Sequence, residues 1–480
     1  MKKVIIALII LLAFAACRQS PASLPTIAGT PAINPDYAGV TIPPAIAPLN
    51  FEYLGEEAAR VYANGQKVRM RGNLAVFGRR QWRKLLAADT ISISVQVKKD
   101  GKWQAFEPFE IYVSIDVIDP YISYRLIPPG YQGWQQMGIY QRELASYCES
   151  TIMENSLTGG DCMNCHTPQW GDPDKFVFHV RAAFGGPILR DGDFIEKLNT
   201  KTDSTISARV YPFWHPTEDM VAFSTNKTLQ VFHAGDPNRI EVYDEASDVV
   251  VYDAAKHEVL WSPLTKSADY FETFPSFSPD GKWLYFCSAA AVSPMPDKFD
   301  QAKYGIYRIA FDAATRSFGD ALETVFDAPA MGKSASFPRV SPDGKYLCFT
   351  LQEYGNFPIW HQDADLWILN LATGEAGPLE GINSDSVDSF HTWSSNSRWM
   401  VFSSRRDDKL YTKLYLGHID ENGQAAKPFL LPQKDPVNYY KKLIYSYNLP
   451  QFMNGKVVLN KRKLLNTIRN SGGTDIKPAE

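Results

Sequence analysis

The sequence lacks the signatures that most directly identify membrane-spanning proteins, nucleic-acid-binding proteins and common enzymes. After residue 16 no stretch is long and apolar enough to form a transmembrane helix. Lys and Arg (49) nearly balance Asp and Glu (53), so the formal net charge of -4 gives no basic excess for binding nucleic acid. No nucleophile elbow, P-loop, HExxH helix or dinucleotide-binding glycine pattern occurs. The composition, 45% hydrophobic and 21% charged, is that of an ordered protein with two or three domains.

Cysteine is also scarce, and its placement excludes a disulfide-rich scaffold. Of the six cysteines, three belong to the two motifs described next, which leaves an odd number. There is no second Cys-x-x-Cys and no His-x(3–5)-His pair to complete a zinc site. The odd remainder argues against a full disulfide framework.

Cys162-Met163-Asn164-Cys165-His166 is the most informative motif. Two thiols three positions apart and followed by His form the attachment signature of c-type haem, in which each Cys adds to one vinyl group. His166 would then be the proximal iron ligand. The alternatives are half of a zinc site and a redox dithiol, and the region lacks the βαβ pattern of thioredoxin-like proteins. The motif predicts one covalent haem c held by Cys162 and Cys165.

The second axial ligand of that iron is predicted at His179, the nearest downstream His. It alternates with Phe176, Phe178 and Val180, so it points away from their apolar face. Other His and Met residues are the alternatives, because Met/His ligation is common in electron-transfer cytochromes. These alternatives are His215, His233, His361, Met137, Met153 and Met220.

The N-terminus resembles a bacterial lipoprotein signal peptide. Two Lys residues precede an apolar stretch over residues 4–14, and small residues precede Cys17. The resemblance implies that residues 1–16 are removed and that Cys17 is lipidated, with ordinary secretion as the alternative. The expected location is the cell envelope of a Gram-negative bacterium, as a periplasmic or outer-membrane lipoprotein.

The next 130 residues divide into three expected segments. Residues 17–49 are rich in Pro and Ala and are predicted to be a flexible tether. Residues 50–147 contain alternating apolar segments at 91–97 and 111–115 around an Asp100-Gly101 turn, which predicts a β-sandwich-like domain. Residues 148–174 would form the haem attachment segment.

The second half of the chain contains an internal repeat. Residues 274–286 and 337–349 both carry Ser-Pro-Asp-Gly-Lys between two apolar strands, and weaker copies begin at Tyr211, Phe390 and Leu449. These copies resemble the blades of TolB-type β-propellers. The resemblance implies a propeller over residues 175–465, a fold that serves many functions.

The ends of the repeat region suggest how such a ring would close. Residues 175–190 are predicted to be the outer half of a blade and residues 449–461 an inner half, and joining them removes free sheet edges. This gives five blades, with six as the alternative, and a disordered tail over residues 466–480. The predicted fold class is therefore all-β, a sandwich-like domain followed by a propeller.

The lipoprotein signal, haem motif and repeats together resemble exported haem-binding proteins of Bacteroidetes-like bacteria. They predict a lipid-anchored mono-haem cytochrome that transfers one electron to a redox partner or envelope complex docked on the propeller or sandwich. The alternative is an envelope-anchored scaffold that binds protein, peptide or glycan, with a structural or sensory haem. Both favour a carrier or binding protein over an enzyme. An oxidoreductase would need an open iron coordination site.

Overall fold

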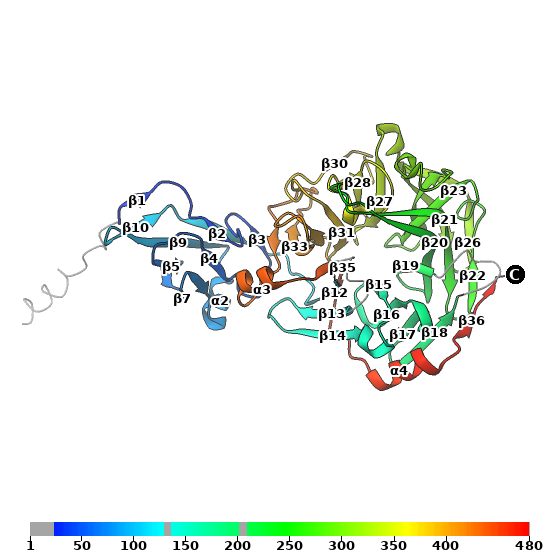
Figure 1. Ribbon diagram of the computed structural model, residues 1–480, viewed down its shortest axis with the longest axis horizontal. Helices are drawn as coiled ribbons and strands as arrows, with labels where there is room; N and C mark the ends of the chain where they lie inside the picture. The colour runs from blue at the N-terminus through cyan, green and yellow to red at the C-terminus, as the bar shows by residue number, and fades with distance from the viewer. Residues whose placement is uncertain (1–23, 129–135, 201–208, 480) are drawn as a thin grey trace, which may run out of the picture.

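The computed structural model describes residues 24–128, 136–200 and 209–479. The signal peptide expected over residues 1–16 and the lipidation site at Cys17 lie outside these residues. An elongated N-terminal domain joins one side of a ring of β-sheets (Figure 1). Within the described ranges, no helix combines the length and apolar character needed to cross a membrane.

The N-terminal domain is a small β-sandwich of a seven-stranded and a four-stranded sheet. Its elements are β1 (Thr26–Ile27), β2 (Ile33–Asn34), β3 (Thr41–Ile42), β4 (Phe51–Tyr53), β5 (Ala59–Ala63), β6 (Gln66–Lys67), β7 (Arg69–Arg71), β8 (Leu74–Val76), α2 (Arg79–Leu85), β9 (Thr90–Lys99), β10 (Lys102–Phe106) and β11 (Phe109–Val113). The alternation in β9 places Ile91, Ile93 and Val95 in the core, as the sequence predicts. The domain begins earlier than expected, because Tyr37 and Val40 are fully buried. The described part of residues 17–49 is therefore part of the sandwich and not a tether.

The propeller has six blades in the described residues, so the alternative of six is correct and the favoured five is wrong. Blade 1 contains β12 (Tyr121–Ile127), β13 (Gly138–Glu143), β14 (Glu149–Glu154) and the late strand β35 (Ser446–Met453). Blades 2 and 3 contain β15 (Met163–Gln169), β16 (Asp172–Val180), β17 (Gly186–Asp191) and β18 (Phe194–Asn199), then β19 (Arg209–Trp214), β20 (Met220–Phe232), β21 (Ile240–Asp253) and β22 (Glu258–Leu260). The all-β propeller fold is confirmed.

Blades 4 to 6 follow in chain order and each contains four antiparallel strands. Their strands are β23 (Tyr270–Phe277), β24 (Trp283–Ala290), β25 (Gly305–Asp312), β26 (Ser317–Phe326), β27 (Ser334–Val340), β28 (Tyr346–Gln352), β29 (Asp365–Asn370), β30 (Ala376–Pro378), β31 (Asp388–Trp393), β32 (Trp399–Ser404), β33 (Lys413–His418) and β34 (Phe429–Leu430). Short 3₁₀ helices lie in the connections, at η2 (Asn155–Thr158), η3 (Ala182–Phe184), η4 (Phe299–Gln301), η5 (Pro329–Met331) and η6 (Pro358–Trp360).

Ring closure differs from the expected pairing. β35 is an inner strand, as predicted, but it pairs with β12 and not with residues 175–190. Residues 121–154, which the sequence assigned to the sandwich and the haem segment, supply the outer strands of this closing blade. The propeller therefore begins at β12 and includes the whole Cys-x-x-Cys-His motif.

The missed blade begins at that motif. Cys165 has a φ of 50° within β15, and the innermost strands of the other blades carry a non-glycine residue with φ between 47° and 56° at the equivalent place. These residues are Tyr211, Phe274, Phe337, Phe390 and Leu449. Each lies at a β-bulge, where two residues of the inner strand oppose one residue of its neighbour. The segment beginning at Cys165 is thus a sixth, highly diverged repeat.

The described part of the C-terminal tail forms a helix and two short strands that pack against the outer strands of blades 2 and 3. Helix α4 (Lys461–Asn470) buries Leu464 and Ile468 in the core between blades 1 and 2. β36 (Thr474–Asp475) and β37 (Lys477–Pro478) then add parallel strands to the outer edges of β18 and β22 (Figure 1). The disordered tail expected over residues 466–480 is therefore wrong for its described part, because these strands cover two sheet edges.

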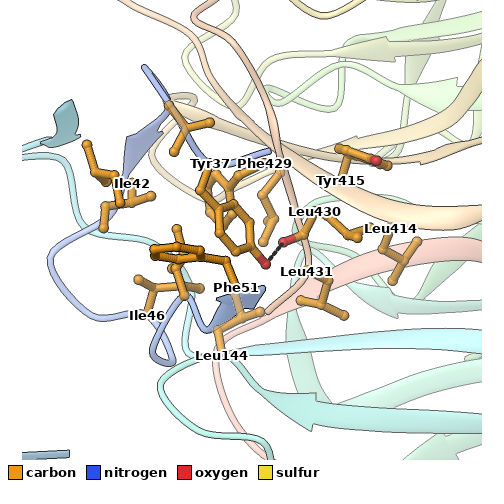
Figure 2. Close-up of a cluster of buried hydrophobic side chains, with 14 of the residues drawn as sticks. Tyr37, Ile42, Ile46, Phe51, Leu144, Leu414, Tyr415, Phe429, Leu430 and Leu431 are labelled. Atoms are coloured by element: carbon orange, nitrogen blue, oxygen red, sulfur yellow. Dashed lines mark hydrogen bonds between the residues drawn. The ribbon is translucent and has the colours of Figure 1, made fainter. Parts of the chain in front are cut away.

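The sandwich and the propeller share one hydrophobic core. Figure 2 shows Tyr37 and Phe51 of the sandwich packed beside Leu430 and Leu431, which lie in and just after β34 of blade 6. The Tyr37 hydroxyl donates a hydrogen bond to the Leu430 carbonyl at 3.3 Å. Helix α3 (Pro436–Lys442) crosses this junction before β35 begins. The two domains are consequently expected to unfold together.

Replacing Tyr37 tests this shared core. Tyr37→Ala is expected to lower the free energy of unfolding by about 3–5 kcal/mol, because it empties a buried site, whereas Tyr37→Phe should cost only about 1 kcal/mol for the lost hydrogen bond. Denaturant unfolding followed by circular dichroism measures both. Tyr112→Ala, at a side chain 47% exposed on the same domain, is the control. A wild type that unfolds in two separate transitions would contradict the coupling.

Candidate ligand site at the propeller axis

A cavity of about 460 Å³ opens at one end of the propeller axis. Its size falls within the range of small-molecule sites. Its floor includes four of the six bulge residues, Cys165, Tyr211, Phe390 and Leu449. Because every blade has this bulge at the equivalent position of its inner strand, the repeated structure of the blades forms the floor of the cavity.

Both thiols of the predicted haem motif face this cavity. Cys162 and Cys165 line it, and both are free and buried. Burial raises the pKa of the Cys165 thiol, which keeps it protonated at neutral pH. The structure therefore brings the two cysteines together at one cavity.

His166 does not share that cavity. Its Nε2 lies 3.1 Å from the Ser123 hydroxyl of β12, and its ring stacks on Phe176 with centroids 5.8 Å apart. Burial lowers its pKa to about 3, so it is neutral. His166 occupies the repeat position that is Pro in four blades and the fully buried His391 in blade 6. Its surroundings are those of a packed side chain between blades 1 and 2.

His179 lies on the opposite face of the same blade. In β16, Phe176, Phe178 and Val180 pack toward blade 1, whereas Val177 packs toward blade 3. Side chains alternate along a strand, so His179 is on the side of Val177 and away from His166. The structure thus separates the predicted proximal and distal ligands by the thickness of a sheet.

The alternative ligands are also dispersed. His215 accepts hydrogen bonds from the Thr217 and Glu218 amides and has a structural place in a turn. Met153 and Met220 are core residues of different blade interfaces. His233 lies at the β20–β21 hairpin, and His361 pairs with Glu241. Among the candidates, all of which lie in the described residues, Met137 is the one that lines the cavity.

Three arginines line the cavity, and sequence reasoning missed them. They are Arg125 on β12, Arg181 after β16 and Arg405 after β32, and no described carboxylate lies within salt-bridge distance of any of the three. Burial lowers the pKa of Arg125, and it lowers the pKa of Arg405 to about 9, so Arg405 remains charged at neutral pH. One signal in the sequence could have found Arg405, because the equivalent position in blade 4 is Ala289 and in blade 5 is Gln352.

Two insertions between strands cover part of the cavity. The long β20–β21 hairpin and the loop containing η6 both contribute lining residues. They are tied together by Tyr354, which donates to Glu241 at 2.8 Å, and by Asn238, which accepts from the Gln362 amide at 3.1 Å. Insertions at corresponding places in two blades thus meet on one face of the propeller.

The haem prediction fits this site only in part. The thiols and arginines share one cavity, but His166 and His179 lie on opposite faces of blade 2 outside it. These residues, as arranged, do not supply an axial pair. No mechanistic step through haem follows from this arrangement.

Comparison with known proteins gives distant structural likenesses. No protein-family model matches the sequence, and no curated protein matches it. Prolyl oligopeptidase B from Galerina marginata is similar in structure at 10% identity over 71% of this chain and 42% of that one, with a TM-score of 0.35. Dipeptidyl peptidase 4 from Porphyromonas gingivalis matches at 11% identity over 75% and 60%, with a TM-score of 0.29. Arabinanase Arb43A from Bacillus subtilis matches at 10% over 63% and 95%, with a TM-score of 0.27.

These likenesses are distant and assign neither an activity nor a substrate to this chain. The chain spans between 30% and 60% of the length of five peptidases that it matches. The matched proteins named here are peptidases and glycoside hydrolases. The electron-transfer function expected from the sequence is corrected by the site itself, because His166 and His179 lie on opposite faces of blade 2 and outside the cavity. In residues 24–128, 136–200 and 209–479 no three His, Cys, Asp or Glu side chains are grouped to hold a metal ion. We therefore withdraw three predictions made from the sequence. They are the electron-transfer cytochrome, the haem-bearing scaffold given as its alternative, and the preference for a carrier or binding protein over an enzyme.

A buried carboxyl pair outside the cavity gives a pH-dependent prediction. Glu272 on β23 lies near Asp248 on β21, and its Oε2 has no partner in the described residues. Burial, reinforced by Asp248, raises the pKa of Glu272 from 4.5 to about 8. The folded protein therefore retains a proton that the unfolded chain releases above pH 4.5, and its stability falls as the pH rises from about 5 to about 8.

Glu272→Gln should remove this dependence. The variant is expected to gain roughly 2–4 kcal/mol relative to wild type as the pH rises from 5 to 8. Denaturant midpoints measured at several pH values would show it, with Glu107→Gln at an exposed position of the sandwich as control. Parallel pH profiles of wild type and Glu272→Gln would contradict the assignment.

Proposed function

We propose that the axial cavity binds an anionic organic molecule with an aromatic or otherwise apolar body. The observation that carries the proposal is Arg405, a side chain only 6% exposed whose guanidinium has no described carboxylate partner. It lies over the Trp360 ring at 3.9 Å and lines the cavity. A buried cation without a counter-charge is costly, and a ligand carboxylate, sulfonate or phosphate would offset that cost.

The remaining lining supports the apolar part of the ligand. Phe232, Ile240 and Val242 of the hairpin and Phe357 and Ile359 around η6 form the walls. The lining as a whole combines polar and apolar surface, which suits a ligand that carries both kinds of group. The three arginines would give the site its preference for anions.

Fluorescent dyes that differ in charge test this proposal. The full chain is expected to bind 1-anilinonaphthalene-8-sulfonate, and Arg405→Gln should weaken that binding about 10-fold or more, because one charge-assisted hydrogen bond is lost. Arg405→Lys should recover part of the affinity. N-phenyl-1-naphthylamine has the same rings without the sulfonate, so its affinity should be the same for wild type and Arg405→Gln.

Arg308→Gln is the matched control, because Arg308 also lies over a Trp ring, Trp283 at 4.2 Å, but pairs with Glu323 on the outside of blade 4. Melting temperatures would show that each variant is folded. Equal affinity of wild type and Arg405→Gln for the sulfonate dye would refute the proposed site.

Several expectations from the sequence stay predictions. They are the TolB-type ancestry of the blades, lipidation at Cys17, a place in the envelope of a Gram-negative bacterium, a docked partner protein, and covalent haem at Cys162 and Cys165. Haem staining of a denaturing gel decides the last, with Cys162→Ala/Cys165→Ala as the comparison. Staining lost only in the variant would establish the thioether links.

A further inference from the structure

The cationic side chains of the cavity form two separate groups. Arg125 and Arg181 belong to blades 1 and 2, and with its amide oriented to accept, Asn164 receives hydrogen bonds from Arg181 Nε at 3.3 Å and Nη2 at 3.1 Å. Arg405 belongs to blade 6 and lies against Trp360 of blade 5. The cavity thus has one cationic group at each of two walls.

The guanidinium groups of Arg125 and Arg405 point in opposite directions around the ring of blades. The Arg125 Nη1 donates to the Met163 carbonyl of blade 2 at 3.5 Å, which turns its guanidinium away from blade 6. Arg405 turns toward blade 5. Because blades 6 and 1 are neighbours, the lining between the two guanidinium groups comes from β35 and its surroundings.

The space between the groups is partly apolar. Leu449 and Phe390 lie in its floor, and Ser446 and Asn448 of β35 add polar atoms. Asn448 is only 3% exposed, and its side-chain oxygen has no partner in the described residues. The Arg125 and Arg405 Nε groups are likewise without described partners. Arg125, Arg405 and Asn448, which all line the cavity, thus each have a buried polar atom without a described hydrogen-bond partner.

We infer that the ligand of this cavity carries two acidic groups at opposite ends of an apolar body, one held by Arg125 and Arg181 and the other by Arg405. This inference rests on the proposed function. A monoanion would satisfy one group and leave the other cationic group of the cavity without a counter-charge. A dianion of matching length satisfies both, so the cavity should favour it.

A matched pair of aromatic acids distinguishes one acidic site from two. Biphenyl-4,4'-dicarboxylate and biphenyl-4-carboxylate share a body and differ by one carboxylate. Isothermal titration of the full chain is expected to show that the diacid binds at least about 10-fold more tightly, since each charge-assisted contact contributes about one to two factors of ten. Arg405→Gln and Arg181→Gln should each reduce diacid affinity to near that of the monoacid.

The monoacid, like the sulfonate dye, should lose about 10-fold in affinity in Arg405→Gln, because the more deeply buried Arg405 holds its single acid, and it should lose little in Arg181→Gln. It should bind poorly to Arg181→Gln/Arg405→Gln. Arg308→Gln should leave both acids unaffected. Equal affinity of the two acids, with the monoacid sensitive to each single substitution, would overturn the two-site inference and leave the single anion site standing. Failure of both acids and of the sulfonate dye to bind would instead overturn the proposed function itself.

Discussion

Pairing between β35 and β12 is the constraint on which the rest of the propeller depends. A ring of sheets leaves two free edges unless its first and last strands meet, and here the C-terminal strand completes the blade that residues 121–154 begin. That pairing fixes the order of all later strands. It makes β15 the innermost strand of the next blade, and so it brings Cys162 and Cys165 to the axis.

The repeated bulge then shapes the cavity. A non-glycine residue with φ near 50° costs about 1–2 kcal/mol, yet all six inner strands adopt it at the bulge. In blades 3 to 6 the side chain at this position is aromatic, and successive rings from Tyr211 to Phe390 lie 4.4–5.6 Å apart. Blades 1 and 2 carry the smaller Leu449 and Cys165 there. The smaller side chains leave space, and the cavity extends toward those two blades.

The sequence predicted the fold class better than the site. Strand alternation and the Ser-Pro-Asp-Gly-Lys copies were sufficient for an all-β propeller, because both depend on short-range turn and strand chemistry. The favoured prediction of five blades was wrong because the repeat copy at Cys165 lacks the Ser-Pro-Asp-Gly-Lys turn sequence. Only the backbone conformation of Cys165 identifies this segment as a repeat copy. His166 was assigned from its motif alone. The repeat gives it the place of His391, a packed side chain, which no local pattern of five residues could indicate.

Comparison with the neighbouring Arg406 shows that Arg405 lacks a counter-charge that the fold can provide. Arg405 and Arg406 are adjacent in the chain, and both are largely enclosed. Arg406 pairs with the buried Asp388 at 2.7 Å, whereas Asp408, the carboxylate that acts on Arg405, is held by Lys413 at 3.2 Å. The fold therefore provides a counter-charge for one of two neighbouring cations and omits it for the one that faces the cavity. Since an unpaired buried charge costs several kcal/mol, the omission is best explained by a counter-charge that arrives with the ligand.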